Sequence, residues 1–142
     1  MRQFFFAVLY LPLRWRFLIW LCYVLCWTTA LLVPQPVSAG GDEAKGMRLF
    51  LFAKTVHISA FAVLAILSGW LGANRRLRWY LLAFLILHAG GTEYLQYIMD
   101  VGRIGCWRDV WLNLIGITLG IAVSWKWWWS EHGVQPAETL SQ

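Results

Sequence analysis

Four long runs of apolar residues, separated by short polar stretches, occupy most of the chain. They cover residues 17–33, 48–71, 79–99 and 110–129. A helix needs about 20 apolar residues to cross a hydrocarbon core of about 30 Å, and the last three runs reach that length. The first run reaches it with its flanking residues. Because a backbone in lipid must satisfy its own hydrogen bonds, the pattern predicts four membrane-spanning α-helices.

The connections between these runs are short, so neighbouring helices are expected to be antiparallel. The predicted fold is therefore an all-α, multi-pass membrane four-helix bundle. Its expected parts are a cytoplasmic or interfacial segment, a first transmembrane helix, a domain of three transmembrane helices and a cytoplasmic tail: residues 1–16, 17–33, 48–129 and 130–142.

The start of the chain has a second interpretation. Arg14 and Arg16 precede the first apolar run, and Ser38-Ala39 stands before Gly40, as in a secretory signal peptide with its cleavage site. The apolar run exceeds the usual signal-peptide core of about 7–15 residues, which favours a retained helix. Cleavage before Gly40 stays open as the alternative.

The composition excludes an ordinary soluble domain. Hydrophobic residues make up 60% of the chain and charged residues 13%, whereas soluble domains carry about 25% charged residues. The net charge of +5 comes from scattered residues without a basic run, so no nucleic-acid partner is expected. Three cysteines without framework spacing predict no disulfide, and no Cys/His pattern typical of zinc sites is present.

The distribution of Lys and Arg predicts the orientation, because cytoplasmic loops of membrane proteins carry an excess of both. If the N-terminus is inside, seven basic residues face the cytoplasm and five face the other side. The seven are Arg2, Arg14, Arg16, Arg75, Arg76, Arg78 and Lys126. Both termini are therefore predicted to lie in the cytoplasm, with the protein in the inner membrane.

Polar residues inside the apolar runs recur at helical spacing. Lys54 and His57 are three positions apart in the second run, and Glu93 and Gln96 are three apart in the third. Each pair therefore shares one helix face. Asp109 opens the fourth run. In the predicted topology all of them lie in the outer third of the bundle, where ionisable groups usually face the bundle interior.

The fourth run places polar and small residues on one face. Asp109, Asn113, Gly116 and Gly120 fall within a narrow arc at 3.6 residues per turn. A GxxxG pair allows a second helix to approach closely. Gly116 and Gly120 are therefore predicted to line a helix contact.

The combined pattern resembles that of the VanZ family of small bacterial membrane proteins: Lys54-x-x-His57-x-x-x-Phe61, Glu93-x-x-Gln96, Arg103 and Asp109-x-x-x-Asn113-x-x-Gly116-x-x-x-Gly120. The resemblance covers about residues 49–124. It departs at Ala53 and Thr92, where the family commonly has acidic residues. The resemblance implies a role in the cell envelope, since the family's namesake is linked to low-level resistance to the glycopeptide teicoplanin. It does not imply a particular reaction.

Three functions fit the polar residues, which are Lys54, His57, Glu93, Gln96, Arg103, Asp109 and Asn113. They form a structural cluster, with interhelical hydrogen bonds worth about 1 kcal/mol each, or they bind an anionic envelope lipid or a glycopeptide-type ligand. Arginine suits such a site because its guanidinium binds phosphate through two hydrogen bonds. The binding role is the leading hypothesis.

The third function is enzymatic, with His57 and Glu93 as acid and base. No nucleophile motif accompanies them. A metal site of His57, Glu93 and Asp109 is a weak alternative because only one histidine is present, so neither a metal nor a cofactor is predicted. The expected partners are membrane lipid and an anionic envelope lipid, and homo-oligomerisation stays open.

Overall fold

The computed structural model describes residues 11–33, 43–71, 74–99 and 107–129. These residues form α-helices and no strands, so the predicted all-α class is confirmed for the described part of the chain. The helices are α2 (Leu13–Leu32), α3 (Glu43–Trp70), α4 (Arg75–Met99), α5 (Trp107–Val123) and α6 (Trp125–Trp129).

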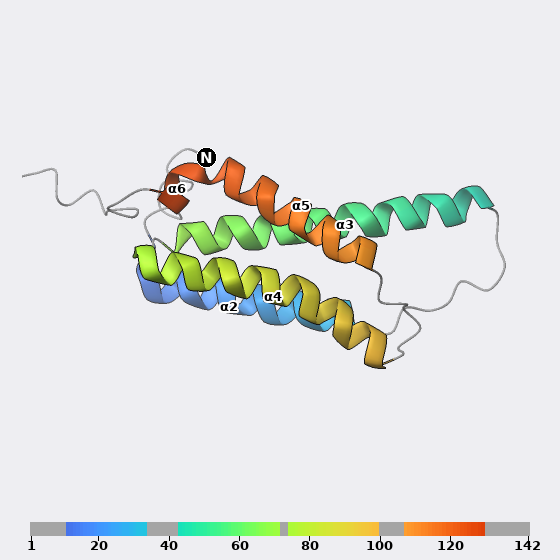
Figure 1. The fold of residues 1–142 in the computed structure, drawn as a ribbon, viewed down its shortest axis with the longest axis horizontal. Coiled ribbons are helices and arrows are strands. Elements are labelled where there is room, and N and C mark those ends of the chain that lie inside the picture. Colours follow the sequence, from blue (N-terminus) through green and yellow to red (C-terminus); the bar gives the residue numbers. More distant parts are fainter. Residues whose placement is uncertain (1–10, 34–42, 72–73, 100–106, 130–142) are drawn as a thin grey trace, which may run out of the picture.

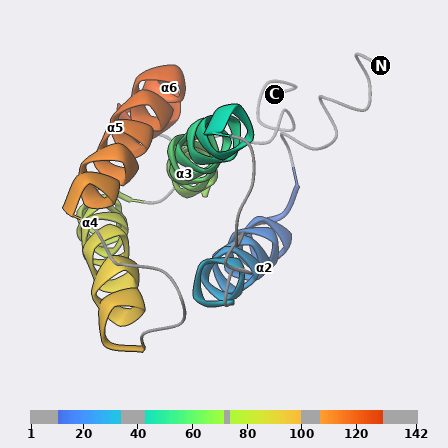
Figure 2. The same cartoon turned by 90° about the vertical axis from the view of Figure 1, so that its right-hand side faces the viewer.

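The long helices lie roughly side by side, and each runs opposite to the one before it (Figure 1). Two ends result. At the α6 end, α3 ends and α4 begins, and at the α4–α5 end, α4 ends and α5 begins. In the end-on view α2 and α5 lie at opposite corners of the bundle, and α3 and α4 occupy the other two corners (Figure 2). The indole of Trp20 donates to Ser68 Oγ at 2.8 Å and Tyr23 Oη donates to the Ala60 carbonyl at 3.0 Å, which ties α2 to α3.

Two glycines allow α5 to lie directly against α3. A Cβ added to Gly116 would collide with the carbonyl of Ile58 and lie 3.1 Å from Phe61 Cβ. A Cβ added to Gly120 would collide with the carbonyl of Ala62 and lie 2.8 Å from Ala65 Cβ. Because the obstacles are largely backbone atoms, the contact requires glycine at both positions.

Some helices are longer than the apolar runs that predicted them, because polar residues add turns at the helix ends or cap those ends. The third run was expected to begin at residue 79, whereas α4 begins at Arg75, with the Asn74 side chain accepting the Leu77 N–H at 2.9 Å. This is an ordinary N-cap contact. The run 110–129 is divided at Ser124, which separates α5 from α6.

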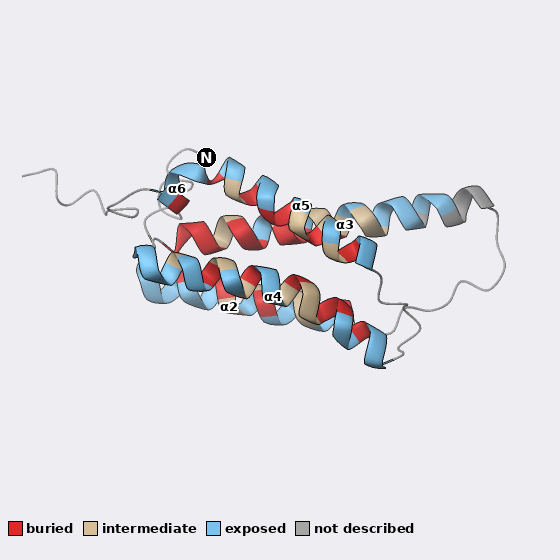
Figure 3. Ribbon diagram, viewed as in Figure 1, coloured by how far each residue is buried: buried red, intermediate tan, exposed pale blue. Residues whose placement is uncertain are grey.

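Buried residues line the faces where the helices meet, and exposed residues cover their outer faces (Figure 3). Large apolar side chains lie on both. Phe61, Leu64 and Leu85 are fully buried in the core, while Leu87 and Val123 are among many large apolar side chains that stay exposed. Among the described helices, the segments Leu13–Leu32 and Phe50–Trp70 are long and apolar enough to cross a membrane. The 17 residues of α5 correspond to only about 26 Å.

Candidate functional site

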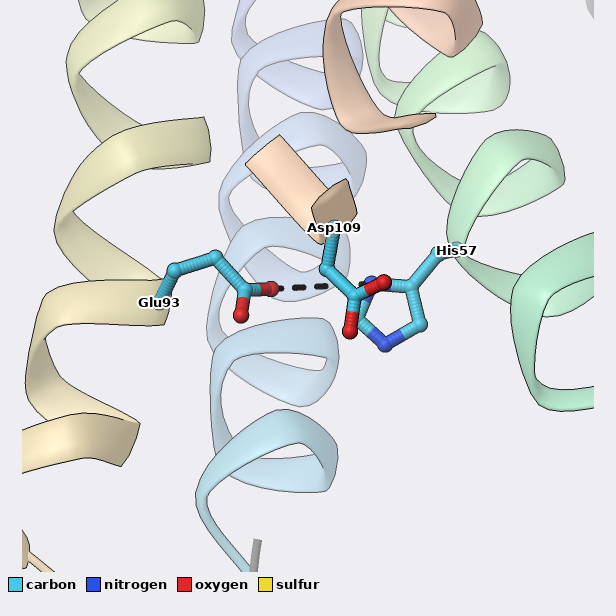
Figure 4. Close-up of side chains that lie close together, drawn as sticks. All are labelled: His57, Glu93 and Asp109. Carbon is cyan, nitrogen blue, oxygen red and sulfur yellow. Dashed lines mark ion pairs between the residues drawn. The ribbon is translucent and has the colours of Figure 1, made fainter. Parts of the chain in front are cut away.

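Three helices bring ionisable side chains together near the α4–α5 end. His57 comes from α3, Glu93 from α4 and Asp109 from α5, and Figure 4 shows their polar atoms turned toward one another. One potential ligand atom from each lies within 4.8 Å of those of the other two, and all three residues are buried. His57 Nδ1 lies 3.9 Å from Glu93 Oε1. That separation allows electrostatic attraction and exceeds a direct hydrogen bond.

Lys54 supplies the positive charge of the group. Its ammonium forms an ion pair with the carboxylate of Asp109, and it lies 5.1 Å from the centroid of the Phe50 ring. Asp109 sits in the first turn of α5, where the helix dipole also favours a negative charge. The Lys54 side chain is 24% exposed and that of Asp109 12% exposed, so this pair is the more open part of the site.

Asn113 fixes the orientation of the histidine. His57 Nδ1 and Asn113 Oδ1 are 3.1 Å apart, and the Asn113 amide donates to the carbonyl of Ala89 at 3.5 Å. An amide oxygen only accepts, so with this placement Nδ1 carries the proton and donates to it. The indole of Trp27 packs edge-on against the imidazole, with 6.1 Å between centroids. We call Lys54, His57, Glu93, Asp109 and Asn113 the polar cluster.

The arrangement brings an ammonium, two carboxylates and an imidazole into a largely dry space between apolar helices. Such groups are expensive to bury and normally have a functional or pairing role. Zinc ligands lie about 2.0–2.2 Å from the ion, so a metal would require the three ligating side chains to move closer together. Direct proton transfer between His57 and Glu93 would likewise require a shorter distance.

The other predicted residues lie elsewhere. Gln96 is buried and donates to the carbonyl of Leu31 at 2.8 Å, which joins α4 to α2. Gly116 and Gly120 form the α3–α5 contact described above. Arg103 lies outside the described residues, as do the predicted cleavage site at Ser38-Ala39 and the tail 130–142.

His88 and Arg16, which were not among the predicted site residues, also make polar contacts between segments. His88 Nε2 lies 2.8 Å from Thr28 Oγ1, and its ring packs between Phe61 and Phe84. Arg16 was interpreted as a marker of topology, whereas its guanidinium is buried and donates to the carbonyls of Leu11 and Trp70 at 2.6 and 3.1 Å. Spacing along one helix carries no signal for either contact, because each partner lies on another segment.

The class defined by these features is an all-α protein of apolar helices that enclose a charged cluster. The family model described as VanZ/LLP1 matches residues 17–129. The chain belongs to this family, and the resemblance stated from the motifs is confirmed. No curated protein and no solved structure matches the chain.

Proposed function

We propose that the chain is a multi-pass protein of the inner membrane, a four-helix bundle with both termini in the cytoplasm. The support is the outward-facing apolar surface and the two helices of spanning length. The charges agree, since Arg75, Arg76 and Arg78 gather at the α6 end, which is then cytoplasmic by the positive-inside rule. The polar cluster in this topology lies near the outer face.

Reporter fusions test this topology. Fusions after Leu32 of the unprocessed chain and near Gly102 are expected to report the outer side. Fusions near Asn74 and Glu131 are expected to report the cytoplasm. A reversed pattern contradicts the orientation, and an N-terminal sequence that begins at Gly40 establishes cleavage of the first segment.

The function that the geometry supports best is binding of an anionic headgroup, from an envelope lipid or a glycopeptide-type ligand, at the polar cluster. The observation that carries it is the gradient of exposure. Lys54 is the most open charged residue of the cluster and its partner is a single aspartate, while His57 and Glu93 are sealed beneath. An incoming phosphate or carboxylate can approach the ammonium from this open side, beside Asp109. Arg108, exposed beside Asp109, adds attraction for an anion.

A specific observation favours an intramembrane enzyme as the second candidate. His57 and Glu93 are 3.9 Å apart, so one bridging water or a small movement brings an acid and a base within reach of a bound headgroup. In this function the anionic part of a lipid is held by Lys54, and the chemistry occurs beneath it. The two functions share the binding step and differ in whether the lipid is changed.

Native mass spectrometry of the full chain, purified in mild detergent, tests the binding. We expect an anionic lipid to co-purify with the wild type and to be lost from Lys54→Gln. The matched control is Lys126→Gln, which removes an exposed lysine at the other end of the molecule. A modified form of the retained lipid favours the enzyme. Equal retention by both variants contradicts binding at the polar cluster and leaves a structural role.

The family resemblance gives a second readout. Expression of the wild type in a susceptible host is expected to lower sensitivity to teicoplanin, and Lys54→Gln is expected to lose more of this effect than its loss of folded protein accounts for. If the effect falls only in proportion to folded protein, the polar cluster is structural.

A further inference from the structure

A separate cavity of about 340 Å³ opens at the α6 end, far from the polar cluster. It lies between the first two turns of α4 and the α5–α6 junction. The residues that carry the argument are Arg75, Arg78, Trp79, Leu82, Ile121 and Trp129. We call this cavity the α4–α6 groove. Its volume is in the range of small-ligand sites, which is about 300–1,000 Å³.

The lining changes from charged to apolar along α4. Arg75, Arg78 and Leu82 are three and four positions apart, so they share one helix face. Leu82 lies seven positions after Arg75, which corresponds to about 10 Å along the helix axis. Cations therefore lie at the start of α4, and Leu82 with Ile121 forms an apolar floor further along. A ligand that fills this groove has an anionic end and a hydrocarbon end.

The charged rim is held in place by the fold. Arg78 Nη1 donates to the carbonyl of Trp128 at 2.6 Å, which anchors one guanidinium across the groove. The rings of Trp79 and Trp129 meet edge-on with centroids 6.4 Å apart. The rim also lies at the N-terminus of the 25-residue helix α4, whose dipole attracts anions. Arginine itself is suited to bidentate contact with phosphate.

From this arrangement we infer that the α4–α6 groove binds an anionic phospholipid of the adjacent leaflet. Its phosphate lies against Arg75 and Arg78, and its upper acyl chain lies along Leu82 and Ile121. The inference rests on the proposed membrane insertion and is independent of the ligand at the polar cluster. A soluble phosphate would satisfy the arginines and leave the apolar floor in water, which is why the charge and the lining together favour a lipid.

Arg76 provides a matched control for the rim. Arg75 and Arg76 are neighbours, both exposed and both in the first turn of α4, but only Arg75 lines the groove. The full chain in mild detergent is titrated with phosphatidylglycerol, and bound lipid is counted by native mass spectrometry. We expect Arg75→Gln to weaken binding about tenfold or more, the loss of one charge-assisted contact. Arg76→Gln is expected to bind within about twofold of the wild type, as an exposed charge outside the site.

A second variant tests the apolar floor with the arginines unchanged. Leu82→Trp fills the groove and is expected to weaken phosphatidylglycerol binding, while glycerol phosphate is expected to bind far more weakly than the lipid to every variant. Equal losses in Arg75→Gln and Arg76→Gln indicate unspecific surface charge and overturn the inference. The inference is also overturned if phosphatidylethanolamine binds as tightly as phosphatidylglycerol. The same holds if glycerol phosphate binds as tightly as phosphatidylglycerol. If Leu82→Trp does not fold, the arginine pair alone decides.

Separate measurements distinguish a failure of this inference from a failure of the proposed function. Reporter fusions measure membrane topology without reference to lipid, and Lys54→Gln is expected to leave phosphatidylglycerol at the α4–α6 groove unchanged. Binding of the titrated phosphatidylglycerol that falls in Lys54→Gln and not in Arg75→Gln overturns the inference for the groove and supports the polar cluster.

Discussion

The two ends of the molecule bind cationic side chains in different ways. At the α4–α5 end, the ammonium of Lys54 pairs with the carboxylate of Asp109, so side chain meets side chain. At the α6 end, Arg16 donates to the carbonyl of Trp70 at the end of α3, and Arg78 to the carbonyl of Trp128 in α6. Cations that bind the last carbonyls of a helix cap it and offset its dipole.

This difference indicates which end is more sensitive to the loss of a partner. A lost partner at the polar cluster leaves an opposite charge in a dry place, which is strongly unfavourable. A lost arginine at the α6 end leaves neutral carbonyls, at a smaller cost. The cluster is therefore the region more sensitive to the loss of a partner.

The largest effect is expected at the contact that Gly116 and Gly120 of α5 make with α3. Gly116→Ala combined with Gly120→Ala drives two methyl groups into the backbone of α3, where overpacking costs about 1–3 kcal/mol or more at each position. We expect the yield of folded protein in mild detergent to fall sharply, as measured by size-exclusion chromatography.

Two other glycines give the control. A Cβ added to Gly90 or Gly91 meets nothing within 4 Å, and alanine favours a helix over glycine by about 1 kcal/mol. Gly90→Ala with Gly91→Ala is therefore expected to keep or raise the folded yield. If the two double variants behave alike, the contact between α3 and α5 is not close.

The next largest effect is expected at the ion pair of the polar cluster. Lys54→Met leaves the carboxylate of Asp109 without its ammonium, and Asp109→Asn leaves Lys54 without its carboxylate. A fully buried pair would lose about 3–5 kcal/mol, and because Lys54 is 24% exposed we expect a smaller loss. The combination Lys54→Met/Asp109→Asn is expected to cost less than the sum of the two, as measured by thermal unfolding in detergent. Simple additivity would mean that the two charges do not interact.

The sequence predicted much of the fold because hydrophobic length carries most of the information about apolar helices. It placed the runs that became α2, α3, α4 and α5, and it missed their polar extensions. Arg75 and its neighbours were assigned to a loop, yet they form the first turn of α4 under the Asn74 cap. The division at Ser124 was missed because the residues on both sides of it are equally apolar.

The sequence also predicted which faces carry the candidate site, but not which side chains meet. Helical spacing put Lys54 with His57, and Asp109 with Asn113. The contacts of Lys54 with Asp109 and of His57 with Asn113 depend on how α3 and α5 are rotated and offset. Gln96 shares a face with Glu93 but donates to the Leu31 carbonyl of α2. A sequence motif cannot indicate this partner, because every residue has a backbone carbonyl.

A smaller effect is expected at the α6 end from Arg16→Gln. The change removes the guanidinium that donates to the carbonyls of Leu11 and Trp70, and we expect a loss of about 1–3 kcal/mol in unfolding free energy. Arg14→Gln is the control, because Arg14 is exposed in the same turn and such changes stay within about 0.5 kcal/mol. Any resistance effect is expected to fall only as far as folded protein falls. A larger loss of function would make the α6 end part of the functional site.

The smallest effect is expected from Asn74→Ala, and it tests whether the two ends act separately. The substitution removes the acceptor of the Leu77 N–H, which costs about 1 kcal/mol. Helix-end effects fade within the first turn, so hydrogen exchange is expected to quicken at the first amides of α4 and stay unchanged near Glu93. Asn74→Asp, which keeps an acceptor oxygen, is expected to exchange like the wild type. If the amides near Glu93 also exchange faster in Asn74→Ala, α4 opens as one unit. The polar cluster and the α4–α6 groove would then be coupled through it, and a lipid bound at one end would alter affinity at the other.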